Sequence, residues 1–276
     1  METRYNFGCY KSPYDERDYL LRTFLTRPKL PEQYSLRDKM TPIRSQGKEG
    51  ACVGFAMATG VKEYQEQIDS GFFISLSPRF VYELAKQISG HKEGTTLKAA
   101  CEVVHEFGVC EEISWPYIAN DVGQPQQAYM ANAEQFKIKS YARITNINEL
   151  KEAIYDPKVG ASLIGVKVYN GMISGGAKET GIVPDPSCWE VLRVLGGHAL
   201  CACAYQDKSP YFKNDGHILC KNSWGDKYYD DGYIYLSYKY IKSNILDAFA
   251  CIDIREHQKF DIIKVADIRG ERGAWT

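Results

Sequence analysis

The sequence lacks an apolar run long enough to cross a bilayer, which takes about 20 residues. Residues 1–19 are polar and contain no apolar core of a secretory signal. Neither sign of charge dominates, because 34 basic residues face 35 acidic ones and the net charge is −1. No global field therefore draws the protein to nucleic acid, a membrane or an acidic substrate. We expect a cytoplasmic protein with no membrane or nucleic-acid partner, while secretion and the oligomeric state stay open.

No CxxC pair occurs among the nine cysteines, so their spacing does not predict a metal site. No internal repeat and no stripe of basic and aromatic residues is visible either. What the chain does have is an unusual number of cysteines for a cytosolic protein. Free cysteine packs as a small hydrophobe, so most of them should be buried thiols. Their odd number leaves at least one unpaired, which is compatible with a reactive thiol.

Apolar residues recur at helical spacing through the first half of the chain. Helices are predicted at four places marked by capping signals: from near Cys52 to before Gly71, from Ser77–Pro78, over 96–107 and after Asn146. The second half shows short apolar or alternating runs separated by Gly, Asp, Asn and Pro. Strands are predicted over 161–169, 198–206, 217–222, 232–237 and 249–254. Helices followed by strands indicate an α+β fold with room for a site between the two parts.

Three segments are predicted along the chain. Residues 1–32 form an N-terminal extension rich in charge and tyrosine, which we expect to pack on the main domain or across its cleft. The main domain covers 33–255, and a C-terminal extension covers 256–276. Within that last extension, FDIIKVADI could form an added strand, and a solvated tail is equally consistent with it.

The stretch QGKEGAC places Cys52 at a predicted helix start. Amide N–H groups at a helix start favour a thiolate and lower the pKa of a cysteine. A nucleophilic thiol also needs a base, and GGHAL supplies His198 at the start of a predicted strand. The base needs an orienting partner, which KNSWG supplies as Asn222. Each motif alone has a plainer explanation: a core cysteine, a structural histidine or a turn.

In this order, TPIRSQGKEGACVGFA, GGHALCACAY and ILCKNSWG resemble the three catalytic blocks of papain-like cysteine peptidases of the C1 type. His198 follows Cys52 by 146 positions (198 − 52) and Asn222 by 170 (222 − 52), so insertions separate the blocks. The resemblance covers about 33–255. It implies the papain-like fold, with a helical half, an antiparallel β-barrel-like half and the active-site cleft between them.

The resemblance implies a catalytic role for four residues. Cys52 and His198 correspond to the thiolate–imidazolium pair, and Asn222 to the residue that orients the imidazole. Gln46 stands six before Cys52, where the family has the glutamine whose amide helps to bind the oxyanion. The implied reaction is hydrolysis of a peptide or protein substrate through an acyl-enzyme. It requires no metal and no organic cofactor.

Six further residues are predicted to form the substrate-binding region. Gly94 matches a family glycine whose backbone pairs with the bound peptide, and its neighbour Glu93 departs from the usual glycine. Trp224 matches the tryptophan that shields the Asn–His contact. The others are Gly197, Ile164 and Tyr228. Gly197 and Ile164 suggest a small or apolar pocket wall, which would favour an apolar side chain two residues before the scissile bond.

Two departures from the family pattern stand out. Glu49 occupies the position of a cysteine, and the disulfide partner of that cysteine is replaced near His91, so we expect that bridge to be absent. We expect no inhibitory propeptide of the usual length before the main domain. Residues 1–32 resemble the short N-terminal segments of bacterial members instead.

Alternatives to an endopeptidase or exopeptidase stay open. The same site could serve an acyl transferase or amidase, in which an acceptor other than water takes the acyl group. The chain could also be a non-catalytic peptide-binding relative, although such relatives usually lose the Cys, His or Asn that is retained here. Substrate products and labelling by a thiol reagent would separate these alternatives.

Overall fold

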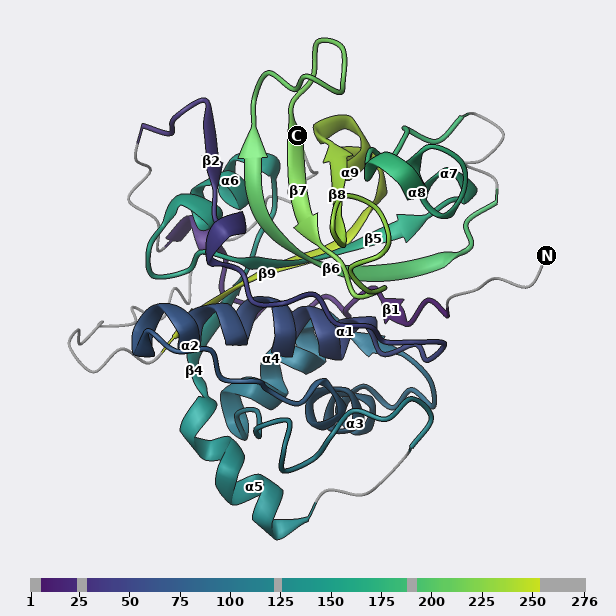
Figure 1. Cartoon of the computed structure of the whole chain (residues 1–276). Coiled ribbons are helices and arrows are strands. Elements are labelled where there is room, and N and C mark those ends of the chain that lie inside the picture. The colour runs from purple at the N-terminus through teal and green to yellow at the C-terminus, as the bar shows by residue number, and fades with distance from the viewer. Residues whose placement is uncertain (1–5, 24–28, 122–125, 188–192, 254–276) are drawn as a thin grey trace.

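The computed structural model describes residues 6–23, 29–121, 126–187 and 193–253, which form a helical half and a sheet half (Figure 1). Within these residues no helix is long and apolar enough to cross a membrane. The C-terminal extension predicted at 256–276, with its suggested strand, lies outside the described residues.

The helical half is built on one long helix that starts at Cys52. It runs through α1 (Cys52–Phe55), the π-helical stretch η3 (Ala56–Lys62) and α2 (Glu63–Ser70). Gly71 ends it with a φ of 75°, a left-handed conformation that glycine adopts without steric cost. The prediction of a helix from near Cys52 to before Gly71 is confirmed.

Three other predicted helices are also present, each begun by a side-chain cap. The Ser77 side chain accepts a hydrogen bond at the start of α3 (Pro78–Ser89), Thr96 at the start of α4 (Leu97–Glu106) and Asn146 at the start of α6 (Ile147–Tyr155). Shorter helical elements were not predicted. They are η1 (Leu21–Thr23), η2 (Arg37–Lys39), α5 (Gln127–Ala133), η4 (Glu134–Phe136), α7 (Asn170–Ile173), α8 (Ala177–Thr180) and α9 (Tyr238–Asn244).

The sheet half contains seven strands, all paired antiparallel. They are β2 (Gln33–Ser35), β4 (Ile138–Arg143), β5 (Ser162–Val168), β6 (Gly196–Gln206), β7 (His217–Lys221), β8 (Tyr233–Ser237) and β9 (Ile245–Asp253). Their order is β4-β9-β5-β6-β7-β8, with β2 added to β6. Among the described residues β4 and β8 do not pair with each other, so the sheet is open and not a closed barrel. The α+β fold class is confirmed.

Strand β6 joins the two halves. It pairs with β5 and β7 and packs against α1 and η3. Both halves contribute to one hydrophobic core, for example through Met57 of the long helix and Leu200 of β6, which are both fully buried. This packing brings the N-terminus of α1 against the first residues of β6, and therefore sets Cys52 near His198.

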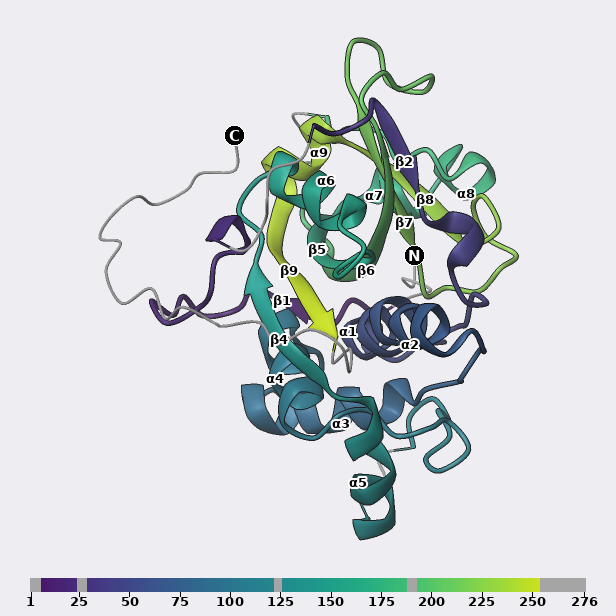
Figure 2. The same ribbon diagram turned by 90° about the vertical axis from the view of Figure 1, so that its left-hand side faces the viewer.

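A second, small sheet comes from the N-terminal region. Strand β1 (Cys9–Tyr10) pairs in parallel with β3 (Thr95–Thr96). Two views at right angles place β1 between the sheet half and helices α1 and α4 (Figures 1 and 2). Part of the N-terminal extension thus lies where the two halves meet.

Candidate active site

Cys52 is the first residue of α1 and is fully buried. Burial raises the pKa of the Cys52 thiol, while backbone hydrogen bonds from Ala199, Gly8 and Val53 act in the opposite direction and do not outweigh it. Burial thus acts against the lowered pKa that the position of Cys52 at a helix start favours. Ala199 follows His198 in β6, so the hydrogen bond from its backbone ties the sulfur to the strand that carries the candidate base.

In the described structure one ring nitrogen of His198 is hydrogen-bonded and the other is not. Its Nε2 lies 2.7 Å from Asn222 Oδ1, and the Trp224 indole stacks on the ring at 4.5 Å between centroids. Its Nδ1 is buried and has no hydrogen-bond partner in the described structure. Burial lowers the pKa of His198 to about 4, although the Asn222 hydrogen bond raises it in part. A neutral imidazole with a free ring nitrogen can accept a proton.

Gln46 is fully buried beside these groups. Its Nε2 donates to the carbonyl of Glu49 at 2.8 Å, and its Oε1 accepts from the Ser223 hydroxyl at 2.6 Å. The Gln46 backbone N–H also donates to the Ser223 carbonyl at 2.9 Å. Two predicted motifs, one before Cys52 and one around Asn222, are thereby tied to each other.

Residues 6–10, which we call the N-terminal segment, lie directly on these groups. The Asn6 carbonyl oxygen is 3.4 Å from Gln46 Nε2, and the Phe7 ring meets the His198 ring edge-on at 6.3 Å. Gly8 hydrogen-bonds the Cys52 thiol through its backbone, and its carbonyl accepts from Thr95 N–H at 2.8 Å. The segment therefore covers both the thiol and the amide of Gln46.

Glycines in the main domain permit this close approach. A Cβ added at Gly94 would stand 2.6 Å from the Gly8 carbonyl oxygen, and one added at Gly197 would stand 2.0 Å from the Cys9 carbonyl oxygen. At Gly165 an added Cβ would lie 2.8 Å from Cys9 Sγ. Gly94 also has a φ of 70°, which other residues rarely adopt. Together these glycines form a channel of backbone along which an extended chain can lie.

The structure brings together some of the predicted substrate-binding residues and not others. Gly94, Gly197 and Trp224 lie beside the segment or the imidazole, as described above. Glu93 is exposed, and Tyr228 is partly buried and packs beside Tyr229, whose ring in turn contacts Trp224. Ile164 is fully buried, and its strand neighbour Gly165 is the residue that faces Cys9. Successive side chains of a strand point to opposite faces, so Ile164 points away from that position.

Sequence reasoning missed several residues of this site. Ser223 had a signal, since it adjoins Asn222 in the motif. Leu246 of β9, whose side chain lies by Gly165 and Gly197, had none. The N-terminal extension was expected to pack on the main domain or across its cleft, but the contacts of its segment 6–10 were not predicted. The eight described cysteines are all free and buried, which confirms that most are core thiols.

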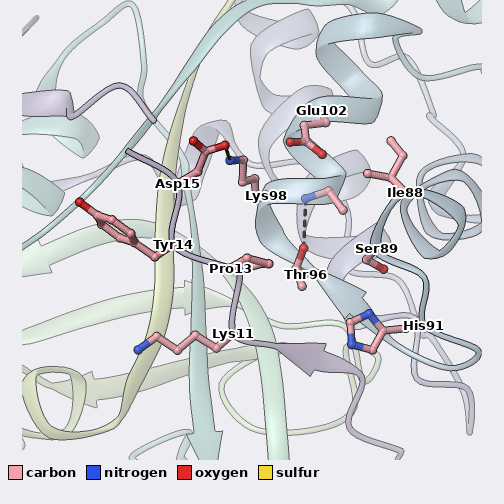
Figure 3. Close-up of a pocket in the computed structure, with 11 residues that line it drawn as sticks. Lys11, Pro13, Tyr14, Asp15, Ile88, Ser89, His91, Thr96, Lys98 and Glu102 are labelled. Carbon is pink, nitrogen blue, oxygen red and sulfur yellow. Dashed lines mark hydrogen bonds and ion pairs between the residues drawn. The ribbon is translucent and has the colours of Figure 1, made fainter. Parts of the chain in front are cut away.

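The chain that follows the segment is fastened by ion pairs. Asp15 and Asp18 lie 2.9 and 2.6 Å from Lys98 Nζ, and Asp18 lies 2.7 Å from Arg143. Figure 3 shows the Lys98 amine directed at Asp15 beside a cavity of about 320 Å³. Residues 11, 13–15, 88, 89, 91, 96, 98, 99 and 102 line this cavity. Residues 11–15 thus lie at the edge of this cavity and are attached to α4 through the Asp15–Lys98 pair.

The chain matches the model of the papain family of cysteine proteases over residues 30–251. An uncharacterized peptidase C1-like protein of Acanthamoeba polyphaga mimivirus is 28% identical over 272 residues, covering 86% of this chain and 82% of that protein. Cathepsin K of Mus musculus is 28% identical over 213 residues, which cover 76% of this chain and 60% of that protein.

Among solved structures, xylellain, a cysteine protease from Xylella fastidiosa, has the same fold with a TM-score of 0.76. The match has 24% sequence identity and covers 92% of this chain and 99% of that chain. At this identity the likeness supports the fold and not the details of the site.

Proposed function

Because this chain belongs to the papain family of cysteine proteases, we propose that it cleaves peptide bonds with Cys52 as nucleophile and His198 as base. Asn222 orients the imidazole, and Gln46 together with the Cys52 N–H binds the oxyanion. One observation carries the proposal. The His198–Asn222 hydrogen bond of 2.7 Å leaves Nδ1 as the free ring nitrogen, on the strand whose next residue hydrogen-bonds the thiol.

The reaction follows from these roles. Nδ1 of His198 takes the proton of the Cys52 thiol, and the sulfur attacks the peptide carbonyl carbon. The negative oxygen is stabilised by Gln46 Nε2 and the Cys52 N–H. The C–N bond then breaks as His198 gives its proton to the leaving amine, which forms a thioester. Water, deprotonated by His198, attacks the thioester and releases the acid and the free thiol.

Cleavage of peptides tests these roles. Wild-type protein should hydrolyse peptides blocked at both ends if it is an endopeptidase, and only peptides with a free terminus if it is an exopeptidase. Cys52→Ala should abolish cleavage, and His198→Ala should reduce it by about 10³-fold or more. Cleavage that persists in Cys52→Ala would rule out the proposed nucleophile.

The alternative reactions give different products. A transferase on the same site would pass the acyl group to an added amine in preference to water, which analysis of the products detects. A non-catalytic relative would neither cleave peptides nor form an adduct with an epoxide thiol reagent. A product that is mainly hydrolysed, with little transfer of the acyl group to the amine, would support a peptidase.

We further propose that the N-terminal extension holds the protein in a resting state. The N-terminal segment supports this because it occupies the thiol and the Gln46 amide at the same time. The segment acts on the thiol through the backbone of Gly8, whose carbonyl oxygen is engaged by the Thr95 N–H. The segment also contributes to the burial that raises the pKa of Cys52 and lowers the pKa of His198.

Release of the extension tests this resting state. In the full chain, Asp15→Asn combined with Asp18→Asn removes the carboxylates that bind Lys98 and Arg143, and should speed labelling of Cys52 several-fold. Glu16→Gln removes one negative charge from an exposed neighbour and is the control for the loss of charge itself. A chain that starts at residue 13 should label fastest, and a peptide of residues 5–19 should slow it again. Equal rates for all these forms would contradict the proposal.

For specificity, we propose that the pocket for the side chain two residues before the scissile bond lies where Cys9 now sits. The closest groups to an added Gly165 Cβ are Cys9 Sγ, Leu97 and Leu246, so the surroundings are apolar. This supports the predicted preference for an apolar side chain and replaces Ile164 by Gly165 and Leu246 as pocket residues. A positional-scanning peptide library that shows a charged preference would contradict it.

A further inference from the structure

A buried ion pair holds the turn that carries Gln46 and Cys52. Two guanidinium nitrogens of Arg79 donate to the two carboxylate oxygens of Glu49 at 2.7 and 2.6 Å. The Arg79 side chain is 0% exposed and that of Glu49 is 9% exposed. A bidentate pair of this kind fixes orientation as well as distance, and it is the stronger for being out of water. Glu49 stands where the papain pattern has its disulfide cysteine.

The same glutamate also holds the side chain of Gln46. The backbone carbonyl of Glu49 accepts the hydrogen bond from Gln46 Nε2, at 2.8 Å. The Tyr117 hydroxyl lies 2.9 Å from Glu49 Oε2 and 2.9 Å from the Gln46 carbonyl oxygen. The Asn120 N–H donates to Glu49 Oε2 at 2.9 Å. Any movement of Glu49 therefore moves the amide that is proposed to bind the oxyanion.

We propose that Glu49 and Arg79 are positioning residues for peptide cleavage: their ion pair holds the turn so that Gln46 Nε2 and the Cys52 N–H both reach the oxyanion. This inference rests on the proposed function. If the pair is broken, the turn loses its anchor to α3 and the two oxyanion donors that it carries are displaced, while His198 and Asn222 stay in place on the sheet half. A displacement of about 1 Å at such a site costs roughly 10²-fold in rate.

Glu83 provides a matched comparison. Its Oε1 accepts from the same guanidinium at 2.7 Å, and its other oxygen lies 2.9 Å from Lys86. Glu83 lies on α3, and in the described structure its ion pairs lead to Arg79 and Lys86, not to the turn. Removing its charge disturbs the ion-pair network without releasing Glu49.

The experiment measures kcat and KM of the full chain, with kcat expressed per thiol that an epoxide reagent titrates. Expressing kcat in this way counts only folded protein with a reactive Cys52. Glu49→Gln should lower kcat about 10–100-fold and change KM less than about threefold, whereas Glu83→Gln should leave kcat within about twofold. Gln46→Ala should lower kcat about 10²–10³-fold in the wild type but less than about tenfold in Glu49→Gln, because the donor is already displaced.

A kcat within twofold of wild type in Glu49→Gln, or fully additive effects of Gln46→Ala, would overturn the inference. If Glu49→Gln does not fold, Tyr117→Phe removes only the hydroxyl between Gln46 and Glu49. It should lower kcat about 3–10-fold at unchanged KM, and an unchanged kcat would overturn the inference too. Activity that survives Cys52→Ala would overturn the proposed function as well, whereas a silent Glu49→Gln with an inactive Cys52→Ala overturns only this inference.

Discussion

Two segments reach Cys52, and they are held in different ways. The turn 46–52 is anchored by the buried Glu49–Arg79 pair and by hydrogen bonds to Ser223. The N-terminal segment is held by a two-residue parallel pairing, and the chain after it by ion pairs of Asp15 and Asp18, whose side chains are 23% and 7% exposed. Buried paired charges are costly to separate, whereas partly exposed pairs are weak and screened by salt. The proposed resting state requires that the first segment stays in place and that the second can leave.

The largest effect should come from breaking the anchor of the turn. Arg79→Met leaves the carboxylates of Glu49 and Glu83 buried without their guanidinium. The free energy of unfolding should fall by about 3–5 kcal/mol, measured by chemical denaturation. Arg17→Met is the control from the chain that follows the N-terminal segment, because its exposed guanidinium pairs with Asp15, and no measurable change is expected. Equal losses in the two variants would remove the contrast between the segments.

A smaller effect is expected from His217, which makes the stability of the sheet half sensitive to acid. Burial lowers the pKa of His217 from 6.5 to about 4, so between these values the unfolded chain binds a proton that the folded chain does not. Stability therefore falls as the pH drops from 7 to 5. His217→Gln removes this contribution, and the variant should lose about 1–2 kcal/mol less than the wild type over that range. Parallel pH curves for the two proteins would contradict the assignment.

The channel of glycines gives a third test. Gly165→Val fills the position now occupied by the Cys9 sulfur. The kcat/KM for peptides with leucine two residues before the cut should fall about tenfold or more relative to peptides with alanine there. Gly176→Val, at a position with nothing within 4 Å, is the control. A uniform loss for both peptides would show that the substitution disturbs the fold and not the pocket.

Salt should have the smallest effect and should act on the N-terminal segment alone. Raising the ionic strength from about 0.05 to 1 M screens the pairs of Asp15 and Asp18 with Lys98 and Arg143. Labelling of Cys52 in the full chain should become about 2–5-fold faster. The chain that starts at residue 13 should show no such change. An equal salt response in both chains would mean that the ion pairs do not hold the segment.

Local signals explain why the helices could be predicted and the contacts of the N-terminal segment could not. Gly71 and the Ser77–Pro78 pair act on their own neighbours, and the helices end and begin there as expected. The pairing of Cys9 with Thr95 joins two residues far apart in sequence and depends on the packing of both halves. A strand of two residues is too short to show a periodicity from which this pairing could be predicted.

The candidate site likewise has a part that could be predicted from the sequence and a part that could not. The order of three motifs was enough to predict that His198 and Asn222 meet, and they lie in hydrogen-bond contact. The proposed pocket depends on strand register, because a shift of one residue would exchange Gly165 for Ile164. The ion pair of Glu49 with Arg79 was missed because the sequence shows only a replaced cysteine and a residue of the next helix.

The central claim is that one of many buried thiols is the nucleophile and that His198 serves it. Mass-spectrometric mapping of the adduct with an epoxide thiol reagent, in the full chain and in the chain that starts at residue 13, tests it most directly. We predict a single adduct on Cys52, formed faster in the shorter chain and much more slowly after His198→Ala. Labelling spread over several cysteines, or labelling of Cys52 that is indifferent to His198, would contradict it.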